Sequence, residues 1–334
     1  MRFGLALPHY DFSMPGGEPV TFEHVADAAR DAERLGFDSV WISDHFFLSL
    51  ARYGGDDAPQ GSLEPMTTLG ALAAVTERVR LGTLVACAPF RHPGVLGKQA
   101  AAIDLLSGGR LDLGIGAGCY GEEFEAFAVP YGEVGDRFGL LEETLQVVEL
   151  LFKEGPADFE GAHFTLRGAY NHPRPVQIPR PPVWLGAKGG ERSLRLAARY
   201  ADGWNTVWRW APEAYADRMR AAREACERVG RDPSTLRLSV GLSTLVGEDE
   251  RDLRRRHEHL VRDTPAAVPP LEELERDGLA GTPDRISERI AAFEDLGVEE
   301  LIASFSSLPF VIHDRSAVEQ FAESILTPAR ASSR

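Results

Sequence analysis

Several side chains that can move protons or bind small molecules stand where short apolar runs end. One of these positions places an acid directly before a histidine, at the end of the run DSVWIS. An imidazole titrates at about pH 6.5, so a histidine at such a position can act as an acid or a base near neutral pH. The sequence therefore predicts acid–base chemistry at this pair, with further run-end side chains forming a substrate pocket. The pair is Asp44 and His45, and the pocket candidates are His9, Cys119 and Tyr120.

A second segment has the composition of an anion seat. In GAKGGERS, residues 186–193, an apolar run ends, two glycines turn the chain, and a helical pattern begins at about Glu191. Gly189 and Gly190 permit close approach to the N–H groups at the helix start, and Lys188 adds positive charge. We expect a phosphate to bind here, although glycine is also common in ordinary strand-to-helix turns. The run GIGAG, which ends at Gly118, indicates close approach of the backbone to a flat ring or to another strand.

The residue patterns typical of several other catalytic chemistries are absent from the sequence. There is no H-E-x-x-H or C-x-x-C spacing for a metal, and His257 and His259 lie in a charged run typical of a solvated helix. No G-x-S-x-G elbow of a serine hydrolase is present. Among the run ends only Asp44 is acidic, which disfavours the carboxylate pair of a glycosidase. The expectation is a site without metal.

The composition and net charge of the chain limit the classes of partner that it can bind. The 334 residues carry a formal net charge of −15, which argues against a general nucleic-acid or anionic-membrane surface. No apolar stretch approaches the roughly 20 residues of a membrane span, and MRFGLALPHY does not resemble a signal peptide. The three cysteines are widely spaced and suggest no disulfide framework. We expect a cytoplasmic protein that acts on a small molecule.

Strand-like runs and helical patterns alternate along the chain. Eight such units predict an α/β fold of the (β/α)8 TIM-barrel type, whose site lies at the carboxyl ends of the strands. A doubly wound sheet is the alternative, but its G-x-G-x-x-G is missing after the first run. We expect one domain over 1–326, with insertions at about 155–182 and 264–281, and a frayed tail at 327–334. The expected strands are 2–7, 38–43, 79–85, 110–116, 182–187, 202–207, 236–242 and 300–305, and the helices are 21–36, 65–77, 93–108, from 138, 191–201, 212–230, from 248, 282–297 and 317–326.

The segments GFDSVWISDHF, RVRLGTLV, FRHP, LSGGRLDLGIGAG and GGERSLRLAARYADGWN, in this order, resemble the luciferase-like monooxygenase superfamily. The likeness is nearer to the branch that uses the deazaflavin coenzyme F420, and it runs from Met1 to about Trp204. It implies hydride transfer, with His45 beside the reactive face of the deazaflavin and Asp44 next to it. It also implies a cis peptide between Leu84 and Val85 behind the ring. Cofactor-binding positions carried over by the resemblance are Leu84, Val85, Gly118, Lys188, Gly189, Gly190 and, across an insertion, Arg276.

The sequence also departs from that branch. Its sugar-phosphate dehydrogenases carry a Glu directly after G-x-G-x-G, where this chain has Cys119, and their tryptophan shortly after S-D-H-F is absent. A different small organic substrate is therefore expected. Two alternatives stay open: an FMN-dependent monooxygenase that uses reduced flavin and O2, and a catalytically silent flavin-binding relative. The resemblance further implies a homodimer, for which the helices at 22–35 and 66–75 offer Ala- and Leu-rich faces.

Overall fold

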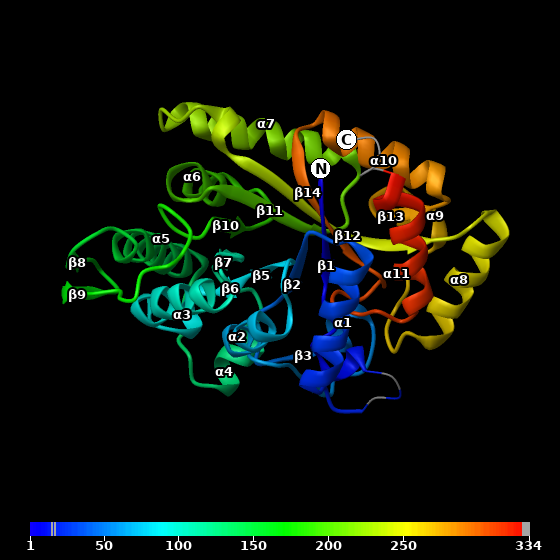
Figure 1. The fold of residues 1–334 in the computed structure, drawn as a ribbon, viewed down its shortest axis with the longest axis horizontal. Helices are drawn as coiled ribbons and strands as arrows, with labels where there is room; N and C mark the ends of the chain where they lie inside the picture. Colours follow the sequence, from blue (N-terminus) through cyan, green and yellow to red (C-terminus); the bar gives the residue numbers. More distant parts are fainter. Residues whose placement is uncertain (15, 17, 329–334) are drawn as a thin grey trace.

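The apolar runs form eight parallel strands that close into a barrel in the computed structural model, which describes residues 1–14, 16 and 18–328 (Figure 1). Register pairs such as Leu5 with Val40 and Val183 with Leu113 hold neighbouring strands together. The pairing of β7 with β10 closes the ring. The expected TIM barrel is thus confirmed. Its strands are β1 (Arg2–Ala6), β2 (Ser39–Ile42), β5 (Arg80–Thr83), β7 (Leu111–Gly116), β10 (Val183–Gly186), β11 (Gly203–Trp208), β12 (Arg237–Val246) and β14 (Val298–Ser304).

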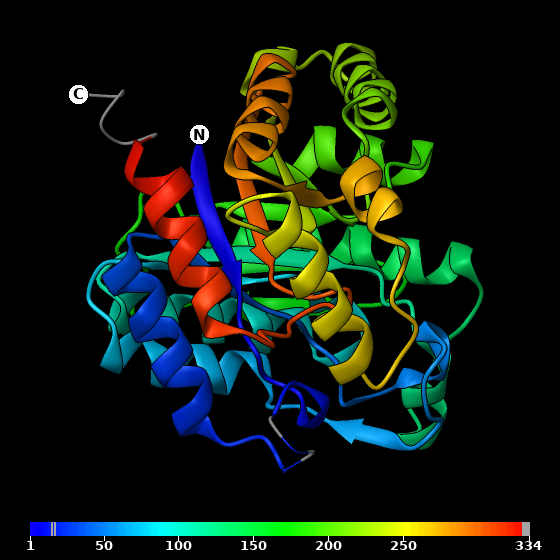
Figure 2. The same ribbon diagram turned by 90° about the vertical axis from the view of Figure 1, so that its right-hand side faces the viewer.

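Helices surround the barrel and begin where the sequence supplies capping groups. The Thr21 hydroxyl accepts the His24 N–H, and Gly36 ends the same helix with φ of 92°. Proline occupies the first turn of four of the helices, where its missing N–H costs nothing. The surrounding helices are α1 (Phe22–Leu35), α2 (Pro65–Val75), α3 (Pro93–Leu106), α5 (Val134–Leu151), α6 (Glu191–Tyr200), α7 (Pro212–Arg228), α8 (Glu250–Asp263), α10 (Pro283–Asp295) and α11 (Arg315–Phe321). Figure 2 shows α1 and α11 side by side.

Several helix boundaries differ from the expected ones, among them the starts of α5 and α11. The helix expected from Phe138 begins at Val134, because Glu133 and Asp136 form a capping box that the apolar pattern does not reveal. The closing helix begins at Arg315 and continues as a π-helix over Ala322–Leu326. Of the tail expected at 327–334, residues 329–334 lie outside the described part of the chain.

Three excursions extend the barrel. The hairpin β8 (Ala157–Glu160) and β9 (Thr165–Ala169) packs on α5. Within 264–281 the chain forms α9 (Leu271–Asp277) and β13 (Leu279–Gly281), which pairs with β12. A third excursion, not expected from the sequence, follows β2. It contains β3 (Phe47–Ser49), the 3-10 turn η3 (Leu50–Tyr53) and β4 (Pro59–Gly61), followed along the chain by α2.

Buried ion pairs occupy the barrel interior near the amino ends of the strands. Arg2 contacts Glu300 at 2.5 Å and Arg80 contacts Asp112 at 2.6 Å, and neither carboxylate is exposed. A buried acid is tolerated when it is paired and hydrogen-bonded. Within residues 1–14, 16 and 18–328, no helix is both long and apolar enough to cross a bilayer.

Candidate active site

A cavity of about 520 Å³ lies at the carboxyl ends of the strands, where a TIM barrel carries its active site. Its size is within the usual range of small-molecule sites. Segments that follow most of the barrel strands contribute to its wall. Among the lining residues are Tyr10, Asp44, His45, Leu84, Val85, Gly118, Cys119, Glu123, Arg137, Lys188, Trp208 and Phe310.

His45 lines this cavity with a carboxylate behind it. Its Nδ1 lies 2.8 Å from Oε1 of Glu123, and Oε2 of Glu123 accepts the backbone N–H of Phe46, also at 2.8 Å. The Glu123 side chain is 1% exposed and the His45 side chain 18%. A carboxylate accepts and does not donate, so Nδ1 carries hydrogen and Nε2 is the ring atom left for a ligand.

Glu123 is a functional candidate that the sequence analysis missed. It lies on α4 (Gly121–Ala126), which directly follows the glycine-rich end of β7. Glu122 and Glu125 on the same short helix are exposed, and only Glu123 and Phe124 turn inward. The local pattern gave no signal for it, because Phe127, one turn further along, is itself 56% exposed.

Asp44 holds the neighbouring loop instead of orienting His45. Its carboxylate accepts two hydrogen bonds from Arg91, at 2.5 and 3.0 Å, and the backbone N–H of Cys87 at 2.7 Å. A bidentate salt bridge between arginine and a carboxylate fixes the orientation of both side chains. Asp44 therefore ties the end of β2 to the segment after β5.

His9, which was expected to line the substrate pocket, is not on the cavity wall. It is fully buried behind Tyr10 and Ser43, with Nδ1 2.9 Å from the Leu7 carbonyl and Nε2 3.0 Å from the Ser43 hydroxyl. Burial lowers the pKa of His9 from 6.5 to about 4, so the ring is neutral at pH 7. Tyr10 is the residue of this strand end that reaches the cavity, and its hydroxyl lies 2.5 Å from that of Ser43.

A backbone bulge forms part of the cavity wall. The Leu84–Val85 peptide is cis, as expected, and both residues line the cavity. A Cβ added at Gly114, Gly116 or Gly186 would lie within 2.8 Å of the Val85 side chain. These glycines therefore make room for the bulge, so of the two readings of GIGAG the approach of another chain segment is the one observed.

The predicted anion seat has the expected backbone. Gly189 has φ of 80°, and Gly190 is the N-cap of α6, which starts at Glu191. The Lys188 ammonium donates to the Val207 carbonyl at the end of β11 and lies 5.9 Å from the Trp210 ring. Partial removal from water lowers the pKa of Lys188. Arg137, on α5, lines the same cavity.

Besides His9, four predicted residues lie off the cavity wall: Gly189 and Gly190, which directly follow the lining residue Lys188, and Tyr120 and Arg276. Tyr120 packs its ring 6.4 Å from that of His45 and donates its hydroxyl to Glu122 at 2.5 Å. Arg276 is on α9 and pairs with the adjacent Asp277 at 2.8 Å, outside the cavity. The structure thus brings together most of the predicted site and leaves Tyr120 behind the wall and Arg276 on the surface.

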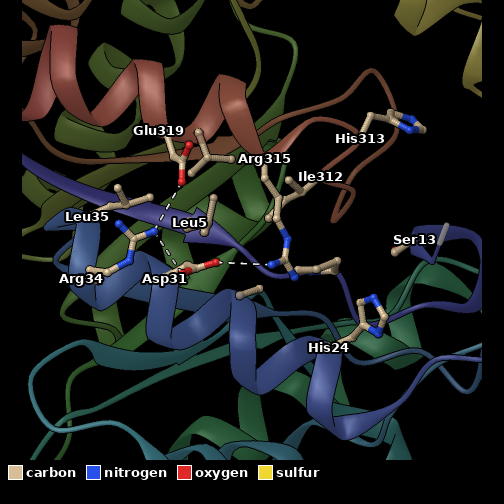
Figure 3. A pocket seen from close by; sticks show the side chains of 13 residues that line it. Leu5, Ser13, His24, Asp31, Arg34, Leu35, Ile312, His313, Arg315 and Glu319 are labelled. Carbon is tan, nitrogen blue, oxygen red and sulfur yellow. Dashed lines mark hydrogen bonds and ion pairs between the residues drawn. The ribbon is translucent and has the colours of Figure 1, made fainter.

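A smaller cavity of about 220 Å³ lies between α1 and α11 (Figure 3). Its charged side chains contact one another: Asp31 pairs with Arg34 at 3.2 Å and Arg315 at 3.7 Å, and Arg34 with Glu319 at 3.5 Å. These ion pairs give each of the four charged side chains an oppositely charged partner within the smaller cavity. In the larger cavity, Lys188 has no such partner among the described residues.

Known proteins resemble this chain over nearly its whole length. An F420-dependent glucose-6-phosphate dehydrogenase of Microbacterium testaceum (strain StLB037) is 31% identical over 295 residues, 81% of this chain and 84% of that protein. The uncharacterised protein Rv0953c of Mycobacterium tuberculosis (strain ATCC 25618 / H37Rv) is 31% identical over 292 residues, 84% of this chain and 93% of its own.

Solved structures share the fold. An F420-dependent secondary alcohol dehydrogenase in complex with an F420-acetone adduct superposes with a TM-score of 0.77 at 20% identity, over 97% of this chain and 98% of that one. The coenzyme F420-dependent tetrahydromethanopterin reductase of Methanopyrus kandleri gives 0.76 at 20% identity, over 98% of each chain. Residues 1–300 match the family described as luciferase-like monooxygenase. With this match, the barrel and a site at the carboxyl ends of its strands, the chain belongs to the luciferase-like monooxygenase family.

Proposed function

We propose that the protein is an F420-dependent oxidoreductase that transfers a hydride between the deazaflavin and a small organic substrate. The observation that carries the proposal is that His45 lines a cavity of about 520 Å³ while Glu123 holds its Nδ1 and leaves Nε2 for a ligand. The names of the relatives, several of them F420-dependent dehydrogenases, support the same class of chemistry.

The described residues fit an anionic cofactor with a flat ring. The bulge at Leu84–Val85 offers a backbone wall, and the glycines beside it leave no side chain except Val85 in that space. The N-terminus of α6 at Gly190 can hold a phosphate, with Gly189 and Lys188 beside it. Gly118, with φ of 78°, would also lie along the ring edge. A bound deazaflavin would supply or accept the hydride there.

The protein residues handle the proton and the geometry. In alcohol oxidation Nε2 of His45 accepts the hydroxyl proton, and in carbonyl reduction it returns a proton to the oxygen. Glu123 orients the imidazole and fixes its tautomer by accepting the Nδ1 hydrogen. Asp44, through Arg91 and the Cys87 N–H, keeps the strand ends on both sides of the bulge in place.

Oxygen dependence separates this function from that of an FMN-dependent monooxygenase. Turnover of a panel of secondary alcohols and carbonyl compounds is followed by F420 absorbance, with and without O2. Equal rates in both atmospheres are expected of hydride transfer. A rate seen only with reduced FMN and O2 would replace the proposal with the monooxygenase, and cofactor binding without any turnover would favour the silent relative.

We further propose a cytoplasmic homodimer. The described cysteines are all free thiols, which suits a reducing compartment. The helices α1 and α2 pack against each other. The alanines of α1 are buried in the core, so the accessible small side chains are on α2, at Gly70, Ala71 and Ala74. Light scattering tests this: a mass near twice the 36.6 kDa of the chain is expected, and a mass of one chain would contradict it.

A further inference from the structure

We propose that Arg52 binds an oxyanion of the substrate, a carboxylate or a phosphate, so that the substrate is an alcohol or carbonyl compound with an acidic substituent. This inference rests on the proposed function and deepens it. It begins from a second cavity of about 460 Å³ that adjoins the active-site cavity. The two share five lining residues, Arg52, Tyr53, Lys188, Trp208 and Pro309.

Two excursions of the chain meet at this junction. Arg52 and Tyr53 belong to η3, in the excursion after β2, and the Tyr53 carbonyl accepts the N–H of Ala267 at 2.8 Å. Ala267 lies in the insertion at 264–281 and also lines the second cavity. Because this backbone hydrogen bond anchors the η3 turn, Arg52 is placed at the junction by the fold.

The Arg52 side chain is exposed and lies beside two aromatic rings, with no carboxylate partner among the described residues. Its guanidinium lies 5.5 Å from the Tyr53 ring and 5.4 Å from the Tyr120 ring, with the Cys119 side chain beside it. Within the described residues no acid pairs with Arg52 or with Lys188. A cation stacked on aromatic rings keeps its N–H groups directed and available.

Two other arginines near the junction have counter-charges, whereas Arg137 on the active-site cavity donates to the backbone carbonyl of Gly132 and stacks on the Tyr131 ring. Arg91 pairs with Asp44 and Glu64, and Arg209 pairs with Glu273 at 2.7 Å and Asp277 at 3.3 Å. The junction therefore has unmatched positive charge in a protein whose net charge is −15. An arginine fork binds a carboxylate or phosphate through two parallel hydrogen bonds.

The position of Arg52 relative to His45 limits the size of the substrate. Both side chains lie near the Tyr120 ring, which is 6.4 Å from the His45 ring and 5.4 Å from the Arg52 guanidinium. One small molecule can thus place its reacting carbon at His45 and its acidic group at Arg52. Cys119, the side chain beside Arg52, has no carboxylate that would pair with the guanidinium in place of the substrate.

The test is calorimetric titration of inorganic phosphate into the full-length protein, with and without saturating F420. The variants are Arg52→Gln and, as a matched control, Arg209→Gln, which removes an already paired arginine from the same second cavity. Phosphate is expected to bind the wild-type protein in the presence of F420. Arg52→Gln is expected to weaken that binding by about tenfold or more, as for the loss of a charged hydrogen-bonding group, and Arg209→Gln to leave it nearly unchanged.

Three results would count against the inference. Equal phosphate affinity of the wild type and Arg52→Gln, with normal F420 binding, would overturn the anion site alone. Competition between phosphate and F420, together with weaker F420 binding by Arg52→Gln, would assign Arg52 to the cofactor tail and overturn its role toward the substrate. Failure of the wild type to bind F420 would overturn the proposed function and the substrate assignment with it.

Discussion

Nδ1 of His45 lies 2.8 Å from Oε1 of Glu123, which is buried on the turn of helix that follows β7. The other oxygen of Glu123 accepts the Phe46 N–H, so each carboxylate oxygen has a hydrogen-bond partner in the loop after β2. This arrangement orients the imidazole and fixes Nδ1 as the ring nitrogen that carries hydrogen. It joins the ends of β2 and β7 into one acid–base unit.

Substitution of Glu123 by Gln keeps the size of the side chain and removes its charge. Turnover is expected to fall by about 10- to 10³-fold, because His45 loses its orienting carboxylate, with a smaller change in KM. Glu125→Gln, an exposed change on the same helix, is the control. A kcat equal to that of the wild type in Glu123→Gln would show that Glu123 is only structural.

Replacement of His45 by Ala should reduce turnover by about 10²–10⁴, the range for a positioned acid or base. F420 affinity, measured by fluorescence titration, should change little, because His45 faces the substrate side of the cavity in this account. Loss of affinity with a normal residual rate would instead make His45 a cofactor clamp. In that case Tyr10, whose side chain lines the same cavity, is the next candidate for proton transfer.

Gly190→Asp tests the anion seat without disturbing the fold. Position 190 has φ of −70° and is the N-cap of α6, where aspartate is a favourable residue. Its carboxylate would stand where the cofactor phosphate is expected, so F420 affinity should weaken about tenfold or more, about 1.4 kcal/mol. Gly190→Asn, similar in shape and neutral, should weaken it less. Equal affinities of both variants and the wild type would move the cofactor tail elsewhere.

His9 should make stability depend on pH. Its pKa is about 4 in the folded protein and 6.5 when exposed, so below pH 6.5 the unfolded chain takes up the proton that the folded chain excludes. Stability therefore falls as pH decreases from 6.5 to 4, by about 3 kcal/mol from this group. Urea unfolding across that range should show a smaller slope for His9→Asn than for the wild type. Parallel slopes would contradict the neutral, buried ring.

The sequence was informative where local chemistry decides the structure. Apolar runs, N-caps and helix-ending glycines located the barrel strands and most helices, and the position of His45 at a strand end placed it at the active face. It was uninformative where burial is decided by tertiary packing. Glu122, Glu123 and Glu125 are chemically alike in the sequence, and only docking of α4 against the His45 loop selects Glu123.

The same limit explains His9 and Arg276. At the end of β1 either His9 or Tyr10 could face the cavity, and packing of His9 against Ser43 and Phe310 decides it. Arg276 was aligned across an insertion, whose length shifts side chains relative to the barrel, and it lies on the surface beside Asp277. The role of Arg52 was similarly hidden, because the excursion that carries it was not expected as an ordered unit.

The most direct test of the account is titration of the purified protein with oxidised F420 and, separately, with FMN, monitored by the fluorescence of each cofactor. The account predicts saturable F420 binding that weakens in Gly190→Asp, and no comparable binding of FMN. Tight FMN binding with none of F420 would contradict the central claim.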